Sequence, residues 1–254
     1  MNEYLYHYTT IEKFLDGISK SNSIRLSPIL EVNDPLDYKE RTFRNKQLFE
    51  SGEGIKSIPL REEYKKTLNE KWISNCKIAC FSTSNIHEEI EGFQLANLWS
   101  YYAGNHTGVC LKLYKDKIDS YFEENFKCYH PLKDSVEYRN KLSHFNYNTD
   151  YNKNEFKGIE ENKSALFFEK LKVWDREQEY RLVCFSTNDY EYIPLEGVLS
   201  EIILGQKIIQ RHELEIKNRF PLINIHKMNY FVGDGKFEKL ELDHKFWKEN
   251  AKVE

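Results

Sequence analysis

Residues 4–18 read YLYHYTTIEKFLDGI, and they join a short strand to a helix. Aromatic and aliphatic residues dominate residues 4–8, a composition that favours a β-strand. Thr9, with Glu12 three residues later, has the pattern of a capping box at a helix start. The apolar residues that follow are spaced i, i+3, i+4 and i+7: Ile11, Phe14, Leu15 and Ile18. Because this spacing places them on one helix face, the sequence predicts a strand followed directly by an amphipathic helix.

Further strands and helices are predicted along the rest of the chain. Short apolar or alternating runs predict strands at residues 24–27, 78–82, 109–113, 179–186 and 198–204. Helical spacing predicts helices within residues 38–75, at 95–102 and at 164–173. Two runs at residues 224–231 and 236–242 flank a Gly-Asp-Gly turn, which predicts a closing hairpin. Such a mixture of strands, hairpin and helices predicts an α+β fold.

The domain organisation follows from the absence of a linker. No stretch rich in Pro, Gly or Ser divides the chain, so residues 1–254 are predicted to form a single domain. Residues from about 115 to 163 are rich in Asn, Lys and Tyr and carry no sustained hydrophobic period. We therefore expect a polar surface insertion there. Its centre, residues 144–160, is expected to be mobile and to contribute few core contacts.

The composition is that of a globular protein, with 40% hydrophobic residues, 31% charged residues and a net charge of −4. This charge excludes a generally basic surface for wrapping duplex nucleic acid, although a local basic groove stays open. The cysteines are odd in number and widely spaced, which favours reduced thiols over a disulfide framework. The N-terminus lacks the pattern of a secretion signal, and no window approaches 18 apolar residues. These features predict a cytoplasmic protein that does not enter a membrane.

Two polar groups in the sequence are candidates for a functional site. Glu177, Glu179 and Arg181 lie at the start of a predicted strand, where alternate residues share one face. Two carboxylates beside a guanidinium are either a surface ion pair of little energetic weight or part of a site. His7 lies between two tyrosines in the first strand, where a histidine is either a satisfied core residue or a catalytic one.

Other site chemistries find less support in the sequence. The hydroxyls of CFSTS at residues 80–84 either belong to a site or cap a helix. The eight histidines are scattered and the cysteines contain no C-x-x-C pair, so no metal is expected. A glycine-rich phosphate loop and a G-x-S-x-G elbow are also missing, which argues against P-loop, Rossmann-type and α/β-hydrolase mechanisms.

Several short motifs resemble a large family of uncharacterised bacterial proteins. In chain order they are YLYHYTT (4–10), SIRLS (23–27), VNDPLD (32–37), CFSTS (80–84), LWSYYA (98–103), HTGVCLKL (106–113) and WDREQEYRL (174–182). The combination of LYHYT, NDP and W-x-x-E-x-E-Y-R is specific, and the chain is identified as a member over residues 4 to about 205. That family is known only as a domain of unknown function.

The order of these motifs also resembles, more distantly, the poly(ADP-ribose) polymerases and related ADP-ribosyltransferases. Those proteins begin with a strand that bears a histidine, continue through a helix and further strands, and later have a strand that opens with glutamate. The resemblance implies an ADP-ribosyltransferase-like split mixed β-sheet core flanked by helices. It also implies that NAD+ is the substrate and that no metal takes part.

The resemblance implies roles for individual residues. His7 matches the histidine that holds the ribose of the nicotinamide half of NAD+, and Glu179 matches the glutamate that binds the ribose 2′-hydroxyl as nicotinamide leaves. Glu177 resembles the first acid of the E-x-E pattern in arginine-modifying members. Phe81 stands where histidine-type members place a tyrosine that stacks on nicotinamide. The other residues expected to bind NAD+ are Tyr8, Thr9, Arg25, Ser82 and Tyr102, with Arg25 and the turn at residues 33–35 closing over the phosphates.

Three functions are compatible with these features. The first is an ADP-ribosyltransferase or NAD+ glycohydrolase, acting as an intracellular toxin or an anti-phage effector on an unidentified protein or nucleic acid. The second is a non-catalytic binding module of the same fold that holds single-stranded nucleic acid or a protein partner by stacking on tyrosines. The third is an RNA 2′-phosphotransferase, for which the EQE stretch supplies few basic residues. The tyrosines in question are Tyr129, Tyr138, Tyr147 and Tyr151.

Overall fold

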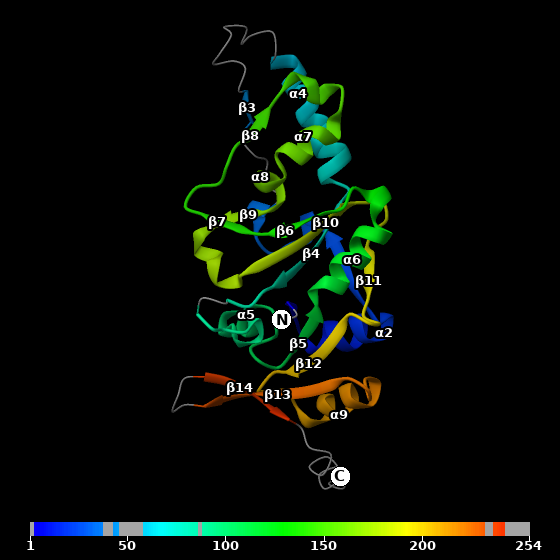
Figure 1. Cartoon of the computed structure of the whole chain (residues 1–254), viewed down its shortest axis with the longest axis vertical. Helices are drawn as coiled ribbons and strands as arrows, with labels where there is room; N and C mark the ends of the chain where they lie inside the picture. The colour runs from blue at the N-terminus through cyan, green and yellow to red at the C-terminus, as the bar shows by residue number, and fades with distance from the viewer. Residues whose placement is uncertain (1–2, 38–42, 46–57, 86–87, 232–235, 242–254) are drawn as a thin grey trace.

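The computed structural model describes residues 3–37, 43–45, 58–85, 88–231 and 236–241 (Figure 1). Most of the described strands belong to one mixed sheet of ten strands, which is flanked by helices. The fold is therefore α+β, as the sequence predicts. The two strands of the predicted closing hairpin pair antiparallel, and the turn between them lies outside the described residues. No helix within the described ranges is long and apolar enough to cross a membrane.

The main sheet runs in the order β11-β2-β4-β1-β5-β12-β13-β14, and β10 and then β6 lie on the other side of β4. Among its described pairs, β12 and β13 are parallel and the others are antiparallel. The strands are β1 Tyr4–Thr9, β2 Ser23–Pro28, β4 Cys76–Ser82, β5 Val109–Tyr114, β6 Leu132–Ser135, β10 Glu179–Phe185, β11 Glu191–Pro194, β12 Leu199–Leu204, β13 Asn224–Phe231 and β14 Lys236–Glu241.

β1 and β2 share one edge of β4 and diverge along it. β2 pairs with β4 at Ile78, whereas β1 pairs with it at Ser82. β10 occupies the opposite edge of β4 over its whole length. Between Ile78 and Ser82, the ladder along the first edge is therefore interrupted among the described strands. A pocket lies at this interruption.

One face of the sheet carries an aliphatic core. It is covered by the helical segment α1 (Ile11–Lys13), η1 (Phe14–Ile18) and α2 (Ser19–Ser21), together with α6 (Lys115–Asn125) and α9 (Gln210–Arg219). The helix predicted after the first strand is confirmed, and its four spaced apolar residues are buried in this core. Its cap differs by one residue. Thr10 Oγ1 accepts a hydrogen bond from Lys13 N–H at 3.4 Å, because Thr9 is the last residue of β1.

The opposite face carries two further clusters of buried side chains. In the first, Tyr6 and Tyr8 pack with Trp99 of α5 (Ala96–Tyr101). In the second, side chains of β4 and β10 pack against the helices α4 (Ile58–Thr67), η4 (Leu68–Ile73), α7 (Glu155–Glu161) and α8 (Lys163–Phe167). Alternate residues of a strand point to opposite faces, so β4 sends Phe81 into the aliphatic core and Ile78 into the second cluster.

The prediction of a polar surface insertion at residues 115–163 was wrong. α6 contributes to the aliphatic core, and the centre of the segment contributes four buried side chains to the second cluster: Phe145, Tyr147, Tyr151 and Ile159. A tyrosine ring supplies apolar area, and its hydroxyl needs only one partner when it is buried. Tyr64 Oη donates to Glu155 O at 2.9 Å, and Tyr151 Oη donates to Glu161 Oε2 at 2.6 Å. Polar composition therefore did not imply exposure.

The predicted helix at residues 164–173 is correct only in its first part. α8 ends at Phe167, and the chain continues as β9 (Glu169–Leu171) and the 3-10 segment η8 (Lys172–Glu177). β9 pairs in parallel with β7 (Glu137–Arg139), and β3 (Phe43–Asn45) pairs in parallel with β8 (Phe145–Tyr147).

Of the helix predicted within 38–75, residues 38–42 and 46–57 lie outside the described residues. Short 3-10 turns occupy η2 Ile29–Glu31, η3 Pro35–Asp37, η5 Gly92–Gln94, η6 Lys127–Tyr129 and η7 Thr149–Asn152.

Candidate functional site

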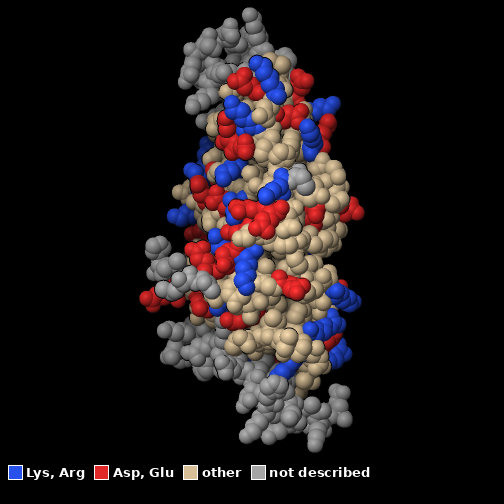
Figure 2. All heavy atoms as spheres, turned by 45° about the vertical axis from the view of Figure 1, so that its right-hand side comes forward, with Lys and Arg blue, Asp and Glu red and all other residues tan. Residues whose placement is uncertain are grey.

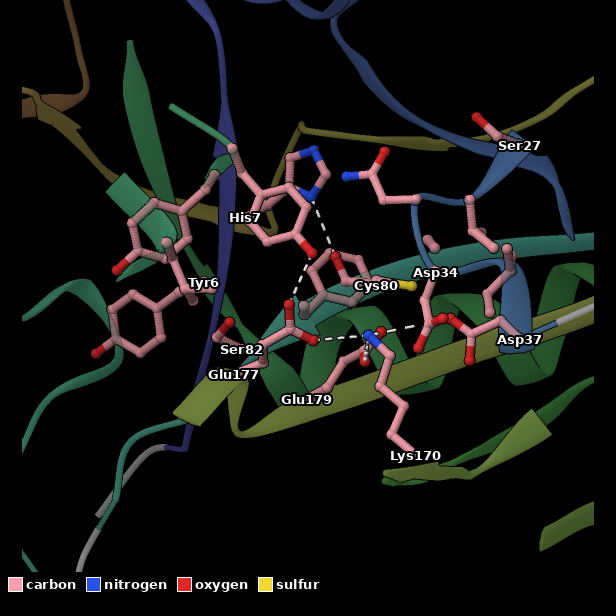
Figure 3. A pocket seen from close by; sticks show the side chains of 18 of the residues that line it. Tyr6, His7, Ser27, Asp34, Asp37, Cys80, Ser82, Lys170, Glu177 and Glu179 are labelled. Carbon is pink, nitrogen blue, oxygen red and sulfur yellow. Dashed lines mark hydrogen bonds and ion pairs between the residues drawn. The ribbon is translucent and has the colours of Figure 1, made fainter. Parts of the chain in front are cut away.

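The pocket opens where β1 and β2 diverge along β4 (Figure 3). Its volume is about 220 Å³. The walls come from β1, β2, β4, the start of β10, the loop that follows β2, and the segments that carry Tyr102 and Lys170. Aromatic and carboxylate side chains dominate the lining, among them Tyr6, His7, Tyr8, Phe81, Tyr102, Asp34, Asp37, Glu177 and Glu179.

Three neighbouring strands bring Tyr6, Ser82 and Glu179 into one row. Tyr6 lies directly opposite Ser82, and Ser82 lies directly opposite Glu179. Directly opposite residues in paired strands point to the same face, so the three side chains share the face that bears the pocket. His7, Ser82 and Glu179 come from three different strands and line this one pocket, as the sequence analysis expects.

His7 lies beside the interrupted edge of β4. Its Nδ1 is 3.2 Å from the carbonyl oxygen of Cys80. A carbonyl only accepts, so this bond assigns the proton to Nδ1 and leaves Nε2 as an acceptor. Nε2 forms no hydrogen bond with the described residues. Burial lowers the pKa of His7 below its ordinary value, so the imidazole is neutral at neutral pH.

Arg181 anchors Glu179 from β10 itself. Arg181 Nε donates to Glu179 Oε1 at 2.9 Å, and Nη2 donates to Oε2 at 3.1 Å. Nη2 also lies 2.9 Å from both carboxylate oxygens of Asp37, and Nη1 donates to the carbonyl oxygen of Phe167 at 2.7 Å. The Arg181 side chain is 1% exposed. Its buried charge is therefore matched by the two carboxylates that it holds.

Lys170 links the carboxylates of the same cluster (Figure 3). Its Nζ lies 2.6 Å from Glu177 Oε2, 2.9 Å from Glu179 Oε2 and 3.9 Å from Asp37 Oδ2. The four side chains are each at most 6% exposed. Burial alone would lower the pKa of Lys170, but the neighbouring carboxylates raise it above its ordinary value. Lys170 is therefore charged and forms ion pairs with both glutamates.

Glu179 is ionised at neutral pH although it is buried. Burial alone would raise its pKa, but Arg181 and Lys170 lower it to about 2. The main chain is also held at this point, because Glu179 N–H donates to Tyr138 Oη at 2.8 Å. Asp37 behaves in the opposite way: burial raises its pKa, and Arg181 and Lys170 only partly oppose this. The cluster thus keeps a fixed negative charge on Glu179.

Glu177 is held at both of its carboxylate oxygens. Tyr102 Oη donates to Oε1 at 2.7 Å, and Lys170 Nζ donates to Oε2 at 2.6 Å. Glu177 does not belong to the strand that the sequence predicts, because η8 ends there and Gln178 has a left-handed φ of 48°. This turn, rather than strand alternation, brings Glu177 and Glu179 to the same lysine.

The structure places most of the predicted site residues together. Tyr8, Arg25, Phe81, Ser82 and Tyr102 line the pocket with His7 and the two glutamates. Thr9 does not, because it pairs with Val109 in the β1–β5 ladder and is 5% exposed. The alternative of a surface ion pair at residues 177–181 is wrong, since Glu177, Glu179 and Arg181 are all buried.

Sequence reasoning missed Lys170 and Asp37 as site residues, and it named Tyr138 only as a stacking ring and not as the partner of Glu179 N–H. Lys170 lies in FFEKLK, where nothing distinguishes it from a surface lysine. The VNDPLD motif pointed to the loop after β2, but the main partner of Asp37 is Arg181, which lies 144 residues further along the chain. Within the described ranges, no group of three or more His, Cys, Asp and Glu side chains is arranged to hold a metal ion.

Residues 98–182 match the family model described as a protein of unknown function, DUF2971. The matched segment runs from α5 into β10 and contains Tyr102, Lys170, Glu177, Glu179 and Arg181. His7 and Asp37 precede it. No curated protein matches the chain, and neither does any solved structure.

Proposed function

We propose that the pocket binds NAD+ and cleaves the bond between nicotinamide and ribose, with ADP-ribose passing to water or to a macromolecular acceptor. The observation that carries the proposal is Glu179, a buried and ionised carboxylate that two cations fix on the wall of an aromatic pocket. Its place at the start of β10, on a pocket that His7 also lines, agrees with the distant resemblance to ADP-ribosyltransferases.

The cleavage step balances without a redox partner. The bond between C1′ and the nicotinamide nitrogen breaks with both electrons moving to that nitrogen, and positive charge develops on the ribose. Water or an acceptor group then attacks C1′ and loses its proton to the solvent, and nicotinamide leaves as a neutral molecule. A fixed carboxylate beside the developing charge stabilises the transition state, by about 3 to 4 kcal/mol in comparable electrostatic sites. Glu179 is in the charged form that this role requires.

The lining offers a partner for each part of the nicotinamide riboside end. The ring of Phe81 is 2% exposed and packs in the aliphatic core, 5.8 Å from the ring of His7, so the less buried ring of His7 provides the stacking surface for nicotinamide. His7 Nε2 would accept a hydrogen bond from a ribose hydroxyl. The volume of about 220 Å³ lies below the roughly 300–1,000 Å³ of pockets that enclose a drug-sized ligand. The proposal therefore places the adenosine half of NAD+ outside the pocket.

The binding-module alternative depends on tyrosine rings that are open for stacking. Tyr147 and Tyr151 are 1% and 3% exposed and pack in the second cluster. Tyr138 is half-buried, and its hydroxyl is bonded to Glu179 N–H. Since these rings already have protein neighbours, the stacking proposal loses its main support and the NAD+ proposal is preferred.

The proposal is tested by incubating the full chain with NAD+ and measuring nicotinamide release, with and without cell lysate. We expect release by the wild type and a loss of about 100-fold or more in Glu179→Gln. Glu213→Gln is the matched control, because Glu213 is also a buried glutamate paired with a lysine, Lys227, but it lies outside the pocket. This control should keep wild-type activity. Absence of turnover in the wild type, or full turnover in a folded Glu179→Gln, would reject the proposal.

Glu177→Gln separates the two glutamates in the same assay. The resemblance assigns Glu177 to the acceptor side of the reaction, so this variant is expected to retain nicotinamide release and to lose transfer to an acceptor in lysate. Glutamine keeps an oxygen for the hydrogen bond from Tyr102 and loses only the charge next to Lys170. Loss of both reactions in Glu177→Gln would assign the two glutamates to one role.

A further inference from the structure

The loop after β2 places Asp34 on the pocket wall. Leu36 N–H donates to Asp34 Oδ1 at 2.9 Å, and Asp37 N–H donates to the Asp34 carbonyl oxygen at 3.0 Å. The first bond forms an Asx turn that fixes the orientation of the side chain, and the second closes the main-chain turn that leads to Asp37. Asp34 lines the pocket and is only 8% exposed. Figure 3 shows Asp34 and Asp37 on one side of the pocket, with Tyr6 and Ser82 on the other.

Asp34 and Asp37 differ in their partners. Asp37 binds Arg181 through both oxygens and lies 3.9 Å from Lys170. Asp34 forms no ion pair within the described part of the chain, and its Oδ2 has no hydrogen-bond partner there. A carboxylate that is buried without a counter-ion costs free energy in the folded state. The open space beside Asp34 is the pocket, so a bound ligand is the partner that fits.

We infer that Asp34 is a ligand-binding residue whose Oδ2 accepts a hydrogen bond from a hydroxyl or amide group of the ligand. We take this ligand to be the nicotinamide riboside end of NAD+, and this part of the inference rests on the proposed function. The inner wall disfavours phosphate, because Lys170 is already paired with Glu177 and Glu179, and Asp34 adds a carboxylate without a cation among the described residues. In this inference the turn at residues 33–35 selects the uncharged or cationic end of the ligand, where the resemblance implies the phosphates.

Arg25 adds a positive charge to the pocket, in contrast to the carboxylates of the inner wall. Its guanidinium lies 4.2 Å from the centre of the Tyr190 ring, and its Nε donates to Ser27 Oγ at 3.1 Å. The side chain is exposed, lines the pocket and forms no ion pair with the described residues. Arg25 thus has free N–H groups for phosphate. Among the lining residues that the structure describes, Arg25 is the cation without an ion pair, and the carboxylates lie on the inner wall, an arrangement that orients NAD+ with the nicotinamide end inward.

Asp34→Asn tests the inference because it removes the charge and keeps an oxygen for the Leu36 N–H. Binding of nicotinamide riboside and of ADP-ribose is measured by titration calorimetry, and the melting temperature of the ligand-free chain is measured beside it. We expect at least about tenfold weaker binding of nicotinamide riboside and a melting temperature raised by about 2–4 °C. Asp189→Asn, an exposed aspartate outside the pocket, is the matched control and should change neither quantity.

Arg25→Gln supplies the complementary arm, since it should weaken ADP-ribose and leave nicotinamide riboside unchanged. Equal binding of nicotinamide riboside by the wild type and Asp34→Asn would overturn the inference and leave the proposed function intact. A lower melting temperature in Asp34→Asn would also overturn it, because Asp34 would then belong to the fold. If the wild type binds neither compound, the proposed function fails. If the melting temperature of Asp34→Asn is raised in that case, Asp34 is still inferred to bind a ligand, but one other than NAD+ that supplies a hydrogen-bond donor.

Discussion

Two stretches of this chain are polar in sequence and buried in the structure, and they are buried in different ways. Residues 177–181 bury charged groups whose partners are other charged groups, Lys170 and Asp37. Residues 145–162 bury tyrosine rings and an asparagine amide whose polar atoms are hydrogen-bonded to nearby protein groups. The first stretch lines a pocket, and the second fills a core.

The two regions differ in whether they leave hydrogen-bonding atoms without a protein partner. In the second cluster, Asn162 Nδ2 donates to the carbonyl oxygens of Gly158 and Asn146, and its Oδ1 accepts from Asn146 N–H. These bonds satisfy the amide within the protein. Around the pocket, Asp34 Oδ2 and His7 Nε2 remain without partners in the described residues. Acceptors without partners beside an open volume are what a ligand would need, and the polar core offers none of this kind in its asparagine amide.

The charged cluster should show the largest loss of stability when one partner is removed. Arg181→Met leaves Glu179 and Asp37 buried without their main counter-ion, and we expect the free energy of unfolding to fall by about 3–5 kcal/mol. The measurement is urea unfolding followed by circular dichroism. Arg176→Met is the matched control, because Arg176 is 72% exposed and pairs with Glu88 at 3.5 Å. A surface pair of this kind contributes less than about 1 kcal/mol. Equal losses in the two variants would contradict a special role for the buried cluster.

Acid should weaken the charged cluster next. The pKa of Glu179 is lowered from 4.5 to about 2 in the folded chain. Its ionised form therefore contributes stability above the unfolded pKa, and this contribution is lost as pH falls from about 4.5 towards 2. The full contribution is on the order of 3 kcal/mol. The difference in unfolding free energy between the wild type and Glu179→Gln should shrink over this range, and a constant difference would rule out the charge as its cause.

The tyrosine-rich cluster should respond to volume rather than to charge. A Cβ added at Gly158 would lie 2.2 Å from Tyr64 Oη and 2.8 Å from Tyr151 Cδ2, so Gly158→Ala forces these rings to move. We expect a loss of about 1–3 kcal/mol in the free energy of unfolding. Gly17→Ala is the control, because the added Cβ meets nothing within 4 Å, and a gain of about 0.4–1 kcal/mol is expected. Wild-type stability in Gly158→Ala would show that this cluster is loosely packed.

Local patterns were sufficient for most of the elements around the site. The strand at residues 4–9, the helix after it and the strands that carry Ser82 and Glu179 follow from periodicity and turn residues, because these signals act over a few neighbours. The sequence also indicated His7 and Glu179 as candidates, because a histidine between aromatic residues and a pair of acids at the start of a strand can be recognised without a structure. Their placement on one pocket depended on strand order, for which only the resemblance offered a guide.

The sequence by itself determined the α+β class, the strand–helix start and the polar residues that deserve a test. Only the tertiary structure decided which of them meet. Arg181 and Asp37 are 144 residues apart in the chain, and neither has a local pattern that names the other as its partner. Burial of the tyrosine-rich segment was likewise invisible, because a tyrosine counts as polar by its hydroxyl and as apolar by its ring. Long-range pairing and the choice between these two properties are set by the packing of the whole chain, because burying a charge or a hydroxyl costs free energy unless a partner lies beside it.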